Sequence, residues 1–116
     1  MTTESTAPVA TTAPPWRTAQ QQAMNVCWAV SGLLDAAPFC ITQTSGAYPV
    51  GSTFSGDIHY AEAAPVHAIA AEYGVPVTET PSGTTDTCHV ARVTVDGTDV
   101  RVWAIVYGTR TQDGAA

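Results

Sequence analysis

The chain has 116 residues, of which 45% are hydrophobic and 12% are charged, and its net charge is −6. This composition is typical of one small acidic globular domain rather than of a disordered chain. No apolar run approaches the roughly 20 residues that span a bilayer. The basic residues are four arginines, too few for binding driven by nucleic-acid phosphates. We therefore expect neither a membrane nor a nucleic acid as partner.

Residues 1 to about 15 are rich in Thr, Ala, Ser and Pro. Such a segment buries too little apolar surface to offset its ordering entropy, so it predicts a flexible tail, with residues 16–110 forming a single domain. The tail has no basic stretch followed by an apolar stretch, unlike a secretory signal peptide. For this reason we expect a cytoplasmic protein. We also expect reduced thiols, because the three cysteines are widely spaced and form no CxxC pair.

A first helix is predicted from Trp16 to about Ala36. Its apolar stripe is formed by positions with helical spacing, Ala23, Cys27, Val30 and Leu34. Pro38 cannot continue a helix and sets the limit.

The middle of the chain predicts shorter elements. Residues 39–44 are a possible strand, and residues 53–60 predict a strand with a bulge or turn at Gly56. A second helix begins near Pro65 and ends before Gly74. Residues 75–80 then predict an edge strand, because Pro76 cannot donate to a ladder.

The last segment, residues 87–107, predicts a long antiparallel hairpin. Asp96-Gly97 suits a type I′ turn, because both residues tolerate a positive φ. A two-residue turn places Arg92 opposite Arg101 on one face of the hairpin, whereas a four-residue loop would shift the register and separate them. The other face is uniformly apolar and must meet the helices. Together the elements predict an α+β fold of two layers, with a mainly antiparallel sheet of about four strands covered by two helices.

The second face of the hairpin carries the candidate interaction residues Arg92, Arg101, Trp103 and Tyr107. Either a helix or loop covers this face and the long arginine stems reach past it to solvent, or the face binds a partner. Trp, Tyr and Arg are the residue types enriched at interface hot spots. We therefore expect a non-enzymatic protein-binding module, whose partner is another protein or a second copy of the chain.

Residues 21–31, QQAMNVCWAVS, resemble the nucleophile segment of papain-like cysteine proteases. The match consists of the sequence Cys27-Trp28-Ala29 and of Gln21 six residues earlier. The resemblance implies a cysteine hydrolase in which Cys27 is the nucleophile, Gln21 contributes to the oxyanion hole and His89 is the base. The next strand offers no carboxamide or carboxylate between Trp103 and Gly108 to orient the imidazole, so the family's pattern is incomplete.

A second resemblance covers residues from about 59 to 106. Their pattern of VHAIAAEYG, VPVTET, a His-Val strand, an Asp-Gly turn and VRVWA is similar to a group of small uncharacterised proteins of actinobacteria and their phages. This resemblance implies an origin in actinobacteria or in their phages and mobile elements, and no particular activity. The acidic charge also permits a third hypothesis, a nucleic-acid mimic that acts as an inhibitor. No ligand spacing indicates a metal site and no motif indicates a cofactor, so we expect neither.

Overall fold

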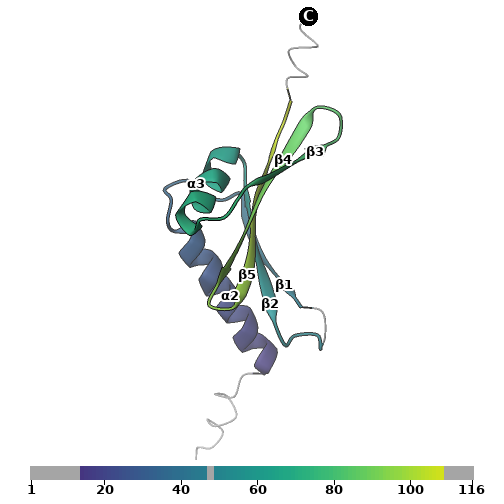
Figure 1. Ribbon diagram of the computed structural model, residues 1–116. Coiled ribbons are helices and arrows are strands. Elements are labelled where there is room, and N and C mark those ends of the chain that lie inside the picture. The colour runs from purple at the N-terminus through teal and green to yellow at the C-terminus, as the bar shows by residue number, and fades with distance from the viewer. Residues whose placement is uncertain (1–13, 47–48, 109–116) are drawn as a thin grey trace, which may run out of the picture.

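The computed structural model describes residues 14–46 and 49–108 of the chain. Two helices and a five-stranded sheet make up the fold (Figure 1), which confirms the α+β class. The elements are, in chain order, α2 (Pro15–Ser31), β1 (Cys40–Ser45), β2 (Phe54–Tyr60), α3 (Ala63–Tyr73), β3 (Thr78–Ser82), β4 (Asp86–Val95) and β5 (Thr98–Val106). Almost all of the predicted tail, and the end of the predicted domain at residue 110, lie outside the described residues. Neither described helix combines the length and apolarity needed to cross a bilayer.

The sheet is mixed, with strand order β1-β2-β5-β4-β3. Three neighbouring pairs are antiparallel, and β2 runs parallel to β5. The prediction of about four strands was one too low, because β1 was predicted only as a possible strand, and the parallel pairing of β2 with β5 was not predicted. Parallel neighbours need a long crossover connection, which here runs through α3, β3 and β4, and such long-range pairing leaves no local signal in the sequence.

The β4–β5 hairpin has the predicted register. Asp96 and Gly97 have φ values of 51° and 79°, as a type I′ turn requires. Arg92 pairs with Arg101 and Val90 pairs with Trp103, so the four-residue loop is excluded.

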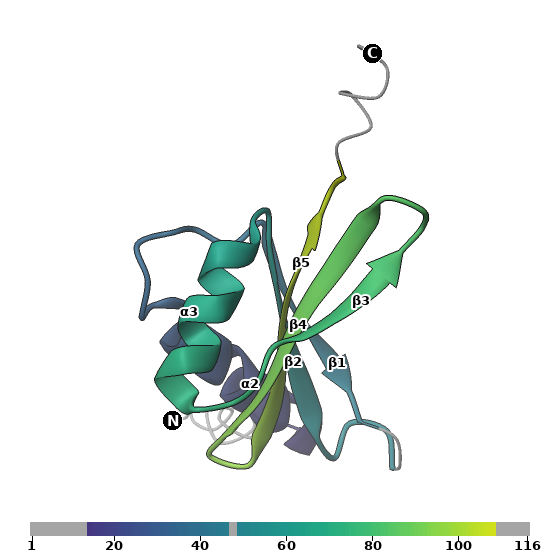
Figure 2. The same ribbon diagram turned by 45° about the horizontal axis from the view of Figure 1, so that its top comes forward.

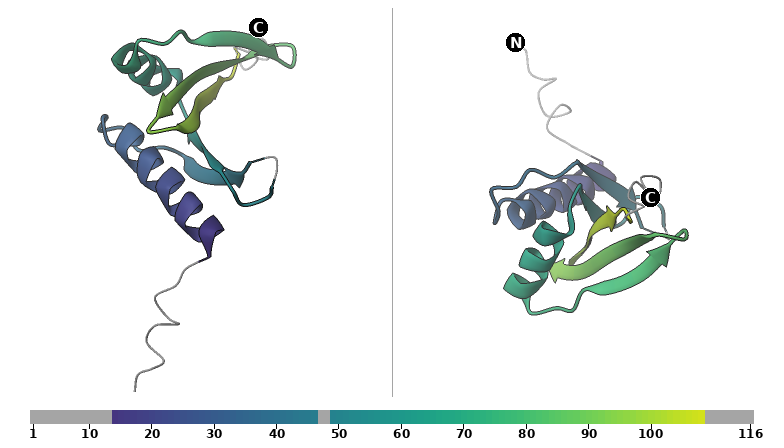
Figure 3. Two further views of the ribbon diagram at one scale, coloured as in Figure 1. Left: turned by 60° about the horizontal axis from the view of Figure 1, so that its bottom comes forward. Right: turned by 90° about the horizontal axis from the view of Figure 1, so that it is seen from above.

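Both helices pack on the same face of the sheet (Figure 3). Helix α2 lies mainly over β1 and β2, and α3 lies over β4 and β5, while the closed end of the β3–β4 hairpin projects past α3 (Figure 2). Side chains alternate along a strand, so only every second residue reaches this core. The buried core residues of the strands are Ile58, Tyr60, Ala91, Val93, Val100, Val102 and Ala104, and those of the helices are Ala23, Val26, Cys27, Val30, Val66, Ile69 and Ala70.

Two predicted boundaries differ from the structure. Helix α2 ends at Ser31 rather than near Ala36, because Gly32, a poor helix former, is its C-cap. Strand β3 begins at Thr78 rather than Val75. The Val75 N–H closes α3 by donating to the Ala70 carbonyl at 2.9 Å, after Gly74 with φ 68°, and this Schellman-type ending uses the residues that were expected to start the strand.

Candidate functional site

Within the part of the chain that the structure describes, one face of the sheet carries no helix. We call this surface, opposite α2 and α3, the open face. Its central residues are Asp57, His59, Val90, Arg92, Asp99, Arg101, Trp103 and Ile105, with Phe39 at its border. Within the described ranges neither helix covers this face (Figure 3), so the alternative of a covering helix does not hold for this part of the chain.

An aromatic cluster runs across the open face. The His59 ring stacks on Trp103, with centroids 3.8 Å apart and planes 1° apart, because the two residues are direct partners in the β2–β5 register. Phe39 meets the His59 ring edge-on at 5.2 Å and is 72% exposed. Aromatic groups held in such fixed contacts present a rigid apolar surface to solvent.

Asp57 forms hydrogen bonds at the centre of this cluster. Its carboxylate accepts a hydrogen bond from the Arg101 guanidinium at 2.8 Å and another from the Trp103 indole N–H. The Arg101 guanidinium also lies 4.8 Å from the centroid of the Trp103 ring. One carboxylate therefore orients both a cation and an indole, and the cation lies over the indole ring.

Asp57 also explains how Arg92 and Arg101 can face one another. Asp99, two residues before Arg101 on β5, instead accepts a hydrogen bond from Thr94 at 2.8 Å. Asp57 is adjacent because it is the partner of Arg101 in the parallel β2–β5 pairing. This role of Asp57 was not predicted from the sequence, because the parallel pairing of β2 with β5 was not predicted.

The predicted interaction residues fall into two groups. Arg92, Arg101 and Trp103 lie together on the open face, with Arg92 exposed. Tyr107 lies just past the end of β5 and is 71% exposed.

The residues of the hydrolase hypothesis are not brought together. Cys27 lies against Gly56, the partner of Val100, whereas His89 pairs with Ala104. Val100 and Ala104 are four positions apart on β5, which is roughly 13 Å at about 3.3 Å per residue. Gln21 donates a hydrogen bond to Asn25 on the exposed side of α2.

The environment of Cys27 does not favour a thiolate. Burial raises the pKa of its thiol above the ordinary value of 9.0, and the Asp57 charge raises this pKa further, against an opposing contribution from the Asp57 backbone. Cys27 also lies in the C-terminal half of α2, and the helix dipole lowers a thiol pKa only near the N-terminus.

A second cluster of polar side chains lies on the helix side of the sheet, where His67 of α3 meets Glu79 of β3 and His89 of β4. His67 Nε2 is 3.0 Å from His89 Nδ1, and His89 Nδ1 is 3.7 Å from a Glu79 carboxylate oxygen. No local ligand spacing in the sequence links His67 with His89, and for this reason no metal site was predicted. Only the β3–β4 register and the docking of α3 bring these residues together.

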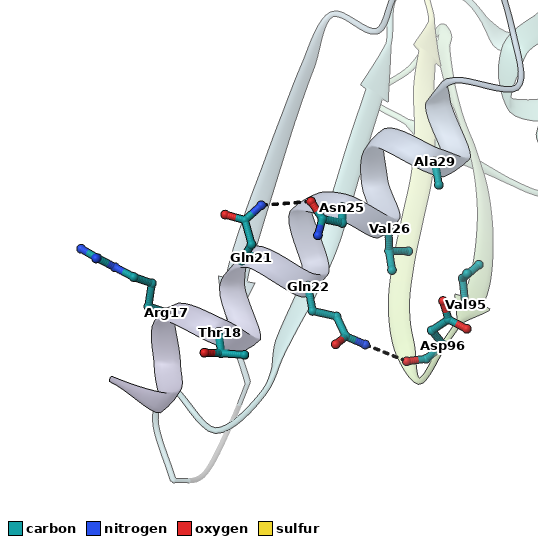
Figure 4. A pocket seen from close by; sticks show the side chains of 9 residues that line it. All are labelled: Arg17, Thr18, Gln21, Gln22, Asn25, Val26, Ala29, Val95 and Asp96. Atoms are coloured by element: carbon teal, nitrogen blue, oxygen red, sulfur yellow. Dashed lines mark hydrogen bonds between the residues drawn. The ribbon is translucent and has the colours of Figure 1, made fainter. Parts of the chain in front are cut away.

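A shallow hollow of about 670 Å³ lies between the N-terminal part of α2 and the β4–β5 turn (Figure 4). The Gln22 amide crosses it and donates to the Asp96 carbonyl at 3.1 Å, while the Gln21 side chain bonds to Asn25 (Figure 4). Most of the side chains that line this hollow are amides or carry methyl groups. They fit the packing of the helix against the turn.

Comparison with protein-family models, with curated proteins and with solved structures finds no match for this chain.

Proposed function

We propose that the chain is a protein-binding module without a catalytic role, that its contact surface is the open face, and that its partner is a second copy of itself. The observation that carries the proposal is the Phe39–His59–Trp103 cluster, fixed by Asp57 on a sheet face that no described helix covers. Exposed aromatic side chains beside arginine are a common mark of a protein–protein contact.

The charge distribution supports a second copy as the occupant. The chain as a whole carries a net charge of −6, with four arginines. Two of these four, Arg92 and Arg101, lie at the middle of the open face with Asp57 and Asp99. The charges of this central region balance, whereas the remaining charged residues of the chain are mainly acidic and would repel a second copy.

A two-fold dimer brings identical patches together, so a patch must complement itself. The open face contains both donors and acceptors, because Arg92 and the carboxylate of Asp99 are both exposed. Two such sheets can pack face to face at about 10 Å, with Trp103 and Phe39 of each copy filling the layer between them.

The decisive measurement is the molar mass in solution by light scattering, over a series of protein concentrations. We expect the wild type to approach twice the chain mass of 12.0 kDa. Replacing the central anchor in Trp103→Ala should weaken the dimer by about 2 kcal/mol or more, roughly thirtyfold in the dissociation constant.

Trp28→Ala is the matched control, since Trp28 is 59% exposed but belongs to α2, away from the open face. It should leave the dimer unchanged. A wild type that stays monomeric at the highest concentration, or equal weakening by the two substitutions, would refute the proposed dimer.

A further inference from the structure

His67, Glu79 and His89 come from three different elements, α3, β3 and β4. Glu79 and His89 are directly opposite one another in the β3–β4 ladder, and opposed residues on a sheet have Cβ atoms about 4.5–5.5 Å apart. Their proximity is therefore set by the backbone rather than by a chance orientation of side chains. Helix α3 adds His67 from above, next to the buried anchor Val66.

The spacing of the three side chains suits a small metal ion. Their possible ligand atoms all lie within 4.8 Å of one another. Zinc binds His nitrogen and carboxylate oxygen at about 2.0–2.2 Å, which places tetrahedral ligands roughly 3.3 Å apart. The contacts of 3.0 Å and 3.7 Å made by His89 Nδ1 lie on either side of this value, so shifts of the side chains alone would complete the geometry.

The donor set also has the right chemistry. The His89 Nδ1 atom faces both an imidazole nitrogen and a carboxylate oxygen, so possible ligand atoms of three side chains lie close together. Two neutral imidazoles and one carboxylate suit divalent zinc, cobalt or nickel, and they partly neutralise the charge of the ion. His67 and Glu79 are exposed, which leaves a route for the ion and room for a water at the fourth position.

We propose that His67, Glu79 and His89 form a binding site for a divalent transition-metal ion, with zinc as the first candidate and one coordination position open to solvent. This site lies on the helix side of the sheet, and it is separate from the open face and from the proposed dimer. By linking α3 to the β3–β4 hairpin, a bound ion would also stabilise the folded state.

The test uses the full-length protein without a polyhistidine tag, treated with a chelator and dialysed. Calorimetric titration with Zn²⁺ measures affinity and stoichiometry, and Co²⁺ absorption reports a tetrahedral site. We expect one equivalent per chain. His67→Ala and His89→Ala should each weaken binding by at least about tenfold, the loss that even an outer-shell partner of a metal ligand can cause, and Glu79→Gln should weaken it in the same direction.

His59→Ala is the matched control, because His59 is the remaining histidine of the chain and lies on the open face, paired with Cys40. It should leave the affinity unchanged. Circular dichroism and melting in chelator establish that each variant is folded, which is expected for His67→Ala and Glu79→Gln since both positions are exposed. The proposal is wrong if the wild type lacks one-to-one binding, if His67→Ala binds as tightly as the wild type, or if His59→Ala weakens binding as much as His67→Ala does.

Discussion

The two faces of the central strands are built from alternating residues of the same sequence, yet they do different things. The face toward the helices carries aliphatic side chains such as Ile58, Val100 and Val102, all fully buried. The open face carries rings and charges that hold one another in place, with Asp57 bonded to Arg101 and Trp103. A strand period of two residues is enough to keep these roles apart.

Strand β2 shows the difference within two adjacent residues. Gly56 has no side chain, so Cys27 of α2 can lie directly against the strand. Asp57, the next residue, points to the other face and organises its charged and aromatic groups. The core face depends on close packing, and the open face depends on hydrogen bonds and ring contacts.

The largest expected effect comes from a matched pair of isoleucine substitutions. Ile58 is fully buried, whereas Ile105 is half-buried on the open face. Ile58→Ala should lower the free energy of unfolding by about 2–5 kcal/mol, through lost burial and a cavity. Ile105→Ala should cost less than half of that amount in a dilute monomer.

Urea unfolding at two protein concentrations measures this contrast. If the open face becomes buried between two copies, the cost of Ile105→Ala should grow with concentration, because association stabilises the folded state by mass action. Equal costs for the two substitutions in the dilute monomer would mean that the two faces are equally buried, and the distinction between them would fail.

The packing of Cys27 against Gly56 gives the next effect. A Cβ at Gly56 would overlap the Cys27 sulfur and would lie 3.3 Å from a Val100 methyl. Gly56→Ala should therefore destabilise the protein by about 1–3 kcal/mol. Combining it with Cys27→Ala should recover most of the loss, because the new methyl occupies the space that the sulfur leaves.

A double-mutant cycle by urea unfolding measures this coupling. Additive losses would show that the two positions do not share one space. Ser55→Ala, at the exposed position preceding Gly56, is a suitable control and should have little effect.

Local signals account for the parts of the fold that the sequence predicted well. The Asp96-Gly97 pair specifies its own turn, and the turn specifies the register of β4 with β5. The spacing of Ala23, Cys27 and Val30 specifies the buried stripe of α2. These residues act on neighbours a few positions away, so a single sequence contains the necessary information.

Long-range pairings account for the parts that sequence reasoning missed. The parallel alignment of β2 with β5 brings Asp57 to Arg101 and His59 to Trp103, across more than 40 residues of chain. The cluster of His67, Glu79 and His89 likewise depends on α3 docking beside the β3–β4 ladder. The position of His67 on a predicted helix gives no indication that Glu79 and His89 lie beside it.

Tyr60 is expected to give a smaller effect of opposite sign. Its side chain is buried on the core face, and its hydroxyl makes no hydrogen bond within the described part of the chain. A buried polar group without a partner costs about 1–3 kcal/mol. Tyr60→Phe keeps the ring and removes that group, so stability should stay the same or rise by up to about 1 kcal/mol.

The pH dependence of stability tests the same environment. Burial raises the pKa of Tyr60 above its ordinary value of 10.0. The stabilisation linked to the protonated phenol is therefore complete below pH 10 and is lost as the pH rises further, because the unfolded chain ionises first. Tyr60→Phe should reduce this alkaline loss in unfolding experiments, whereas Tyr107→Phe, at an exposed position, should not. An equal alkaline loss in wild type and Tyr60→Phe would contradict the assignment.

Thiol reactivity gives the smallest perturbation, because labelling requires no substitution. Cys40 and Cys88 lie in the register of the open face, and Cys27 is buried on the core side. Burial also raises the pKa of Cys27, and the thiolate is the reactive form. A maleimide at neutral pH, followed by peptide mass spectrometry, should label Cys40 first and Cys27 last.

The same experiment separates this interpretation from the cysteine hydrolase hypothesis. Nucleophilic catalysis needs an activated Cys27 whose reactivity depends on a nearby base. His89→Ala should leave the labelling rate of Cys27 unchanged, because His89 contacts His67 and Glu79 instead. If Cys27 reacted faster than Cys40 and His89→Ala slowed it, the core face would contain a reactive centre. The hydrolase hypothesis would then displace the division between a packed face and a binding face.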